Sequence, residues 1–132
     1  MAINHRNAGI HHIGLRCNDM AITKKFYQDV LGFTLVFDTP AIIAFVAGPA
    51  IIAFQKAKAE FQKDVFMPFN IGPDHVALTC ETEGELHRVA KELSEAGVDN
   101  TGVKLDETLQ KLYVAFKDPN RFNGNFIWLN YV

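Results

Sequence analysis

The sequence predicts an α+β fold made of two similar β-α-β-β-β halves. A strand-like segment that opens on a histidine, residues 12–17, recurs 63 residues later as residues 75–80. The glycines that end the helical segments following these strands, Gly32 and Gly97, lie 65 residues apart. Two separate features therefore repeat at nearly the same spacing, which indicates a duplication of the whole unit rather than of one motif.

The composition fits a single domain, 1–132, with a real core. The chain has 132 residues, of which 48% are hydrophobic. Its 13 basic and 15 acidic residues give a net charge of -2. We therefore expect neither nucleic acid nor a membrane as partner, because both select clustered Lys and Arg. No apolar run is long enough to cross a bilayer and the N-terminus lacks a signal-peptide pattern, so we expect a cytoplasmic protein. Cys17 and Cys80 read as buried thiols, although a disulfide between them is conceivable.

The first half, 9–56, begins with an alternating segment in which His12 and Arg16 share one face. Asn18 or Asp19 can cap the helix that follows. Gly32 ends this helix. Three strands are expected next, and hairpin signals separate them. The expected helix stripe is Ile22, Phe26, Tyr27, Val30 and Leu31, and the expected strands are 33–37, 41–47 and 50–55.

A connector, 57–72, joins the halves. Its first part is polar and its second part, around Pro68, is apolar and irregular. We expect its aromatic side chains to pack over the edge of the core; the alternative is a mobile flap.

The second half, 73–132, repeats the order of the first. A strand over 75–80 precedes a capping box in which Thr82 and Glu85 satisfy each other's backbone N–H groups. Turns are expected at 118–120 and 123–125. The expected helix stripe is Leu86, Val89, Ala90 and Leu93, and the expected strands are 98–103, 112–116 and 126–131.

Three segments resemble the vicinal oxygen chelate superfamily, which includes glyoxalase I, extradiol dioxygenases and bleomycin-resistance proteins. They are the His-Ile-Gly-Leu opening at 12–15, the FYQDVLGF segment at 26–33, and the DP…GN segment over 118–125. The resemblance implies two βαβββ modules whose mixed sheet curls around a cleft, with the helices on the outer face. It also implies a homodimer and a small-molecule substrate or ligand.

The resemblance further implies a divalent metal (Zn, Fe, Mn or Ni) held by one histidine from each module, here His12 and His75. The closing strand of the family usually adds a glutamate. Trp128 stands at that position in this sequence, and its indole offers no lone pair to a metal. Gln55 is the oxygen donor on the other closing strand, and Asn130 is an inexact one. No Asp or Glu follows Asp118.

Two functions therefore compete. In the first, the protein is a metal-dependent lyase or dioxygenase, with Tyr113 as acid/base or orienting group and Arg16 as a substrate contact. In the second, it is a metal-free binding protein of the bleomycin-resistance type, whose cleft is walled by Phe126 and Trp128. A scaffold without a ligand is a third reading. His11 is expected to be a surface residue.

Overall fold

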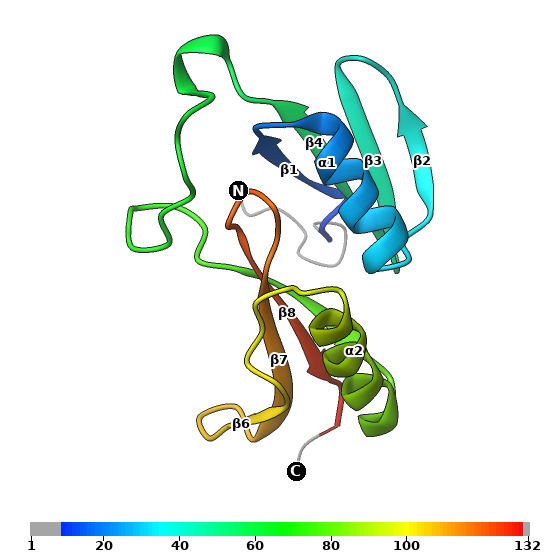
Figure 1. Ribbon diagram of the computed structural model, residues 1–132. Coiled ribbons are helices and arrows are strands. Elements are labelled where there is room, and N and C mark those ends of the chain that lie inside the picture. Colours follow the sequence, from blue (N-terminus) through cyan, green and yellow to red (C-terminus); the bar gives the residue numbers. More distant parts are fainter. Residues whose placement is uncertain (1–8, 131–132) are drawn as a thin grey trace, which may run out of the picture. The chain divides into compact units, whose positions relative to one another are not determined.

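The computed structural model describes residues 9–130. These form two compact α+β units, and the boundary along the chain lies between Lys63 and Asp64 (Figure 1). Each unit has the order β-α-β-β-β and its own four-stranded mixed sheet. The predicted fold class and the duplication are confirmed. The boundary lies inside the predicted connector. No helix within 9–130 is long and apolar enough to cross a membrane.

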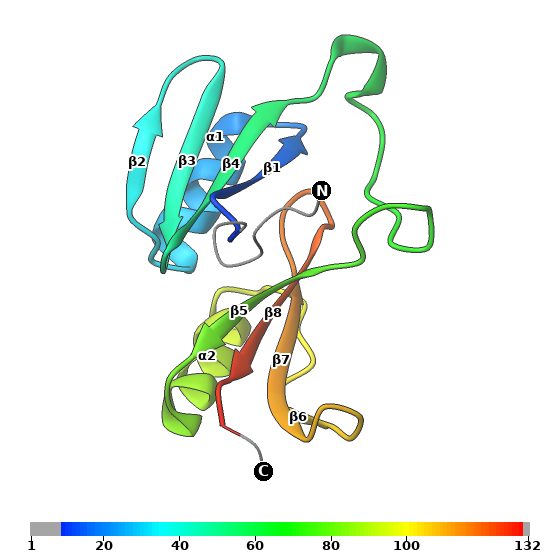
Figure 2. The ribbon, with the colours of Figure 1, turned by 180° about the vertical axis from the view of Figure 1, so that it is seen from behind.

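The first unit holds a sheet with strand order β1-β4-β3-β2, in which β1 runs parallel to β4 and the other pairs are antiparallel. The helical segment lies across one face of this sheet (Figure 2). Its elements are β1 His12–Cys17, α1 Met20–Lys25, the π-helical turn η2 Phe26–Val30, β2 Leu35–Asp38, β3 Ile42–Ala47 and β4 Ala50–Lys56.

Helix α1 begins at the predicted cap: the Asp19 side chain accepts a hydrogen bond of 3.0 Å from the backbone N–H of Ile22. Gly32 ends the helical segment with φ 75°, a left-handed conformation that suits glycine. The predicted stripe was wrong at Ile22, which is 56% exposed, whereas Thr23 is buried. The stripe therefore runs along the face of Thr23, Phe26 and Tyr27.

An aromatic cluster fills the core of the first unit. The Tyr27 ring lies 4.8 Å from that of Phe54 and 5.6 Å from that of Phe45. Both phenylalanines are almost fully buried, at 1% and 0% exposure. The core therefore lies between the sheet and its helical segment.

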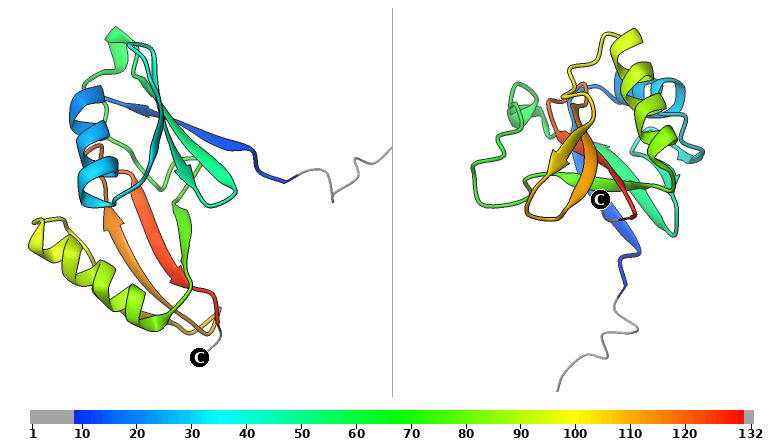
Figure 3. Two further views of the ribbon diagram at one scale, coloured as in Figure 1. Left: turned by 90° about the vertical axis from the view of Figure 1, so that its right-hand side faces the viewer. Right: turned by 90° about the horizontal axis from the view of Figure 1, so that it is seen from below.

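The second unit repeats this arrangement, with strand order β5-β8-β7-β6 and β5 parallel to β8. Helix α2 lies along one face of the sheet (Figure 3). Its elements are β5 Val76–Cys80, α2 Glu83–Glu95, β6 Lys104–Asp106, β7 Lys111–Lys117 and β8 Asn123–Trp128.

Helix α2 begins at Thr82, whose hydroxyl accepts a hydrogen bond of 3.0 Å from the N–H of Glu85. This is the predicted half of the capping box; the Glu85 carboxylate instead binds Arg88 at 2.6 Å. That guanidinium holds the pKa of Glu85 below its usual value. Gly97 ends the helix region with φ 73°, as Gly32 does in the first unit. Leu86, Val89 and Leu93 are buried, as the stripe predicted.

Two strands differ from the sequence-based prediction. The predicted strand 98–103 is mostly irregular, and β6 forms just after it. The last strand begins at Asn123 rather than Phe126, so the predicted turn at 123–125 was wrong. Tyr131, the predicted end of this strand, lies outside the described residues.

The connector contains a short 3-10 turn, η3 Ala59–Phe61, followed by irregular chain. Phe66 packs edge-to-face on Phe122, with the ring centroids 4.6 Å apart. Phe66 therefore packs as expected, whereas Phe61 and Phe69, at 53% and 90% exposure, do not pack over the core edge.

Candidate functional site

The register of the first sheet assigns each side chain to a face. Residues directly opposite each other on paired strands share a face, and successive residues alternate. Phe54 and its neighbours Leu15 and Ile43 lie on the helix side. His12 therefore lies on the helix-free face, by which we mean the face of each sheet opposite its own helix. The side chains on the helix-free face of the first sheet are His12, Gly14, Arg16, Phe37, Ile42, Ala44, Val46, Ile51, Ala53 and Gln55.

The same reasoning applies to the second sheet. Val114 and Phe126 lie opposite each other, buried on the helix side. His75 directly precedes Val76, which pairs with the helix-side Gly124, so His75 belongs to the helix-free face. The other side chains on this face are Ala77, Thr79, Lys104, Asp106, Lys111, Tyr113, Ala115, Lys117, Asn123, Asn125 and Ile127.

Nδ1 of each histidine lies within hydrogen-bond distance of the residue before it. His12 Nδ1 lies 2.8 Å from His11 Nδ1, and His75 Nδ1 lies 2.8 Å from Asp74 Oδ1. Within residues 9–130, no hydrogen bond or ion pair engages Nε2 of either ring. Because an ionised carboxylate only accepts hydrogen bonds, Asp74 places a proton on Nδ1 of His75 and leaves the Nε2 lone pair for a ligand.

His11 is exposed, as expected, and it also contacts the His12 ring. Its ring contacts that of His12 edge-to-face, with the centroids 5.1 Å apart. It is therefore the neighbour that sets the orientation of the His12 ring, as Asp74 does for His75.

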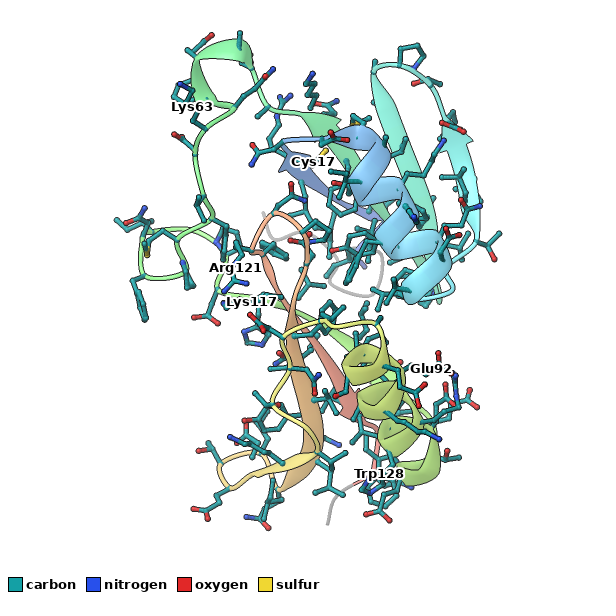
Figure 4. All side chains as sticks on the ribbon, viewed as in Figure 1. Cys17, Lys63, Glu92, Lys117, Arg121 and Trp128 are labelled. Carbon is teal, nitrogen blue, oxygen red and sulfur yellow. The ribbon has the colours of Figure 1, made fainter. Side chains whose placement is uncertain are left out.

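The predicted orientation of two aromatic residues was wrong. Phe126 is 7% exposed and stacks on Phe116 with the ring centroids 5.6 Å apart, on the helix side of the sheet. Trp128 lies on the same side, where its indole N–H donates to the backbone carbonyl of Glu81 at 3.3 Å. Figure 4 shows Trp128 beside one end of α2. Neither side chain lines the face that carries His75.

The physical reason is the register of the closing strand. The turn before it ends at Arg121, which has φ 64°, and the strand then begins at Asn123. The strand therefore starts three residues earlier than predicted. This odd shift in register reverses which residues of the closing strand share a face with His75. Asn125 lies on the helix-free face of the closing strand, next to Ala77 of the histidine strand. The position we had assigned to Trp128 is therefore taken by a neutral amide.

The remaining predicted site residues lie farther along the sheets. Gln55 pairs with Arg16, four residues beyond the His12–Ile51 pair, which is about 13 Å along the strands. Arg16 Nη1 donates to the Lys56 carbonyl at 3.2 Å. Gln55 and His12 are therefore too far apart to share one ion.

Tyr113 lies on the helix-free face of the second sheet, half-buried, in register with Ile127. This row is about 13 Å from that of His75 along the strands. Asn130 is exposed and follows the end of β8. Tyr113 thus remains a candidate wall or orienting group on the predicted face, whereas Asn130 lies beyond the sheet at the end away from His75.

Acidic ligands are scarce on the helix-free faces. The first sheet has none among its described residues, and the second has Asp106, which lies opposite Lys111 at the far edge. No group of three or more His, Cys, Asp and Glu side chains in 9–130 is arranged to hold a metal. The donors that the helix-free faces offer near the histidines are thus neutral: the His12 and His75 imidazoles and the side-chain amides of Asn123 and Asn125.

The two cysteines play no visible part in this chemistry. Both are buried on the helix side, and Cys17 Sγ lies 3.4 Å from Met20 Sδ. Burial, with a smaller contribution from Glu85, raises the pKa of the Cys80 thiol. Cys80 is therefore a packing residue rather than a reactive thiolate.

Comparison with known proteins agrees with this geometry. Residues 9–127 match the model of the Glyoxalase/Bleomycin resistance protein/Dioxygenase superfamily. The chain belongs to this superfamily, as its sequence motifs predicted.

Individual relatives are distant. The chain is 26% identical over 119 residues to the uncharacterized protein YwkD of Bacillus subtilis (strain 168), covering 85% of this chain and 90% of that protein. Lactoylglutathione lyase from Agrobacterium tumefaciens is similar in structure, with a TM-score of 0.74 at 16% identity over 92% of this chain and 94% of that one. A glyoxalase family protein from Enterococcus faecalis has a TM-score of 0.75 at 20% identity, over 92% and 98%. These structural likenesses show the fold alone.

Proposed function

We propose that this protein is a metal-dependent enzyme, a lyase or dioxygenase of its superfamily, that acts on a small organic substrate. One observation carries the proposal. Each module presents a histidine on its helix-free face, with Nδ1 beside a polar group of the preceding residue; for His75, the Asp74 carboxylate leaves Nε2 for a ligand. This is the usual arrangement of a metal-binding imidazole.

The residues that would hold the ion are His12 and His75, and the Asn125 amide oxygen is a further neutral donor. Imidazole suits zinc, iron and nickel, and oxygen donors also admit manganese. A divalent ion would polarise adjacent oxygens of the substrate. Because the donor set lacks an anion, the affinity for metal should be lower than in a site with a carboxylate, and an anionic substrate would strengthen it.

The chain's own residues have distinct tasks in this proposal. Asp74 keeps the proton of His75 on Nδ1, so that Nε2 accepts. His11 orients His12 in the same way. Tyr113 and Arg16 are too far from the histidine rows to act at the same atom. They would instead contact the more distant parts of the substrate.

A metal-free binding protein is the second candidate. The observation in its favour is the lack of a carboxylate on the helix-free face of the first sheet, together with the apolar side chains there. In this case, His12 and His75 donate or accept hydrogen bonds directly to the ligand. The aromatic wall expected from Phe126 and Trp128 does not support this candidate, because both lie on the helix side.

Metal analysis separates the two candidates. The protein should be purified without a histidine tag or chelator and compared with a His12→Ala, His75→Ala double variant. His87→Ala removes an exposed histidine on α2 and serves as the matched control. We expect near-stoichiometric metal in the wild type and the control, and its loss in the double variant. Metal-free wild-type protein that still binds small organic ligands would support the second candidate.

We also propose a cytoplasmic homodimer, by analogy with the superfamily. Sedimentation at micromolar concentration tests the dimer, and a clean monomer would remove that part of the proposal.

A further inference from the structure

A hydrogen-bonded row of polar groups crosses the helix-free face of the second sheet at the end where β5 begins. Lys117 Nζ on β7 donates to Asn123 Oδ1 on β8. The Asn123 amide donates to the backbone carbonyl of Asp74 at 3.2 Å, and the Asp74 carboxylate binds His75. The row therefore links an ammonium group to the candidate ligand histidine across three neighbouring segments.

Lys117 is unusual in its surroundings. It is half-buried, and no carboxylate among residues 9–130 forms an ion pair with it. Its hydrogen-bond partner is the neutral amide of Asn123. In Figure 4, Lys117 lies on the side of the strands away from α2. A half-buried ammonium that is hydrogen-bonded to a neutral amide keeps its charge available for an anion placed beside it.

The fold itself does not require this row. The equivalent pair in the first sheet is Val46 opposite Ile51, which is apolar. The strands pair in the same way in both sheets, so Lys117 and Asn123 are not needed to hold β7 against β8. A function in ligand binding explains why polar groups occupy these positions in the second sheet.

We infer that Lys117, held in place by Asn123, forms a binding site beside His75 for a carboxylate group of the substrate. The Lys117 ammonium supplies the charge, and the asparagine fixes its position. The nearest competing anion, Asp74, is held to His75 Nδ1 and does not pair with the lysine. This inference deepens the proposed function by naming an organic carboxylate as substrate class. It rests on that function only in placing the substrate on this face, since carboxylate binding needs no metal.

Titration with simple carboxylates tests the inference. Acetate and benzoate are added to metal-free protein, with acetamide and benzamide as uncharged analogues, and backbone amide shifts are followed by NMR. Lys117→Met removes the charge, and Lys117→Arg keeps it. Lys104→Met is the matched control, because Lys104 lies on the same face but opposite Tyr113, two rows away. Thermal unfolding checks that each variant is folded.

We expect Lys117→Met to weaken carboxylate binding at least tenfold, about the value of one charge-assisted hydrogen bond. The affinity of Lys117→Arg and of Lys104→Met for carboxylates should stay within about twofold of that of the wild type. The shifts should centre on residues 74–77 and 115–125, and the amides should bind equally to all variants. Wild-type-like binding of benzoate by Lys117→Met would overturn the inference. The inference would also be overturned if the wild type bound benzoate and benzamide with equal affinity, or if it bound neither.

This outcome is separate from that of the metal analysis. Lys117→Met should retain the metal content of the wild type, because Lys117 is not a ligand. Loss of metal in the histidine double variant with unchanged benzoate binding by Lys117→Met would contradict the carboxylate site alone.

Discussion

The two units share a scaffold but present different chemistry on their helix-free faces. Both have a histidine at the start of a strand that runs parallel to the closing strand. Around His12 the neighbouring strands offer Ile51 and Val46, whereas around His75 they offer Asn123 and Lys117. Duplication preserved the histidine and its orientation, and the positions beside it diverged. The second unit therefore carries the polar part of ligand recognition in this account.

The closing strands of the two units also carry different residues on their helix side. Ile52 packs opposite Phe45 in the first unit, and Gly124 lies opposite Phe116 in the second. Phe54 in the first unit and Phe126 in the second occupy equivalent positions, because each lies opposite a leucine of the histidine strand. This correspondence makes each unit a control for the other, and three sets of substitutions test it.

The largest effect is expected for Phe126→Ala. Because Phe126 is a core residue stacked on Phe116, its loss should lower the free energy of unfolding by about 3–5 kcal/mol. Phe54→Ala should cost a similar amount in the first unit. Ile127→Ala, on the helix-free face, is the control and should cost less. Denaturant titration measures all three. An unchanged stability of Phe126→Ala, with altered ligand binding, would return Phe126 to the ligand site and refute the register.

A smaller loss is expected for Gly124→Ala. A Cβ atom at this position would lie 2.4 Å from Cζ of Phe116, so the ring must move. Overpacking of this kind should cost about 1–3 kcal/mol. A Phe116→Leu background, which shortens the opposing side chain, should reduce the cost. Equal cost in both backgrounds would mean that the ring contact is not the reason for the glycine.

The smallest effect is expected at the helix caps. Thr82→Ala removes the bond from the Glu85 N–H and should cost about 1 kcal/mol. Asp19→Ala removes the equivalent bond in the first unit. Serine at either position retains an acceptor and should restore most of the stability. A cap variant without measurable loss in thermal unfolding would show that tertiary packing alone holds that helix start.

Much of the fold could be predicted because local signals and the repeat agreed. Asp19 and Thr82 cap their helices as expected, and Gly32 and Gly97 adopt the left-handed conformation expected at helix ends. Ile22 was misplaced because hydrophobicity assigned it to the stripe, whereas the neighbouring polar residue Thr23 takes the buried position.

The site was harder to predict, for a reason visible in one segment. Asn123 and Gly124 have the composition of a turn but lie in a strand, where the glycine makes room for the Phe116 ring. Arg121 adopts the left-handed conformation of the turn without being glycine. The turn-like composition therefore placed the predicted start of the strand three residues too late. A register that is shifted by an odd number of residues exchanges the two faces of a strand. Phe126 and Trp128 were assigned to the site for this reason, and Asn125 and Lys117 were overlooked.

In the proposed function, His12 and His75 are both ligands of one divalent ion. Calorimetric titration of zinc or nickel into metal-free wild type, His12→Ala, His75→Ala and the His87→Ala control tests it most directly. We expect one ion per chain in the wild type and control, and at least about tenfold weaker metal binding in each single variant. Wild-type affinity in either His12→Ala or His75→Ala would contradict it.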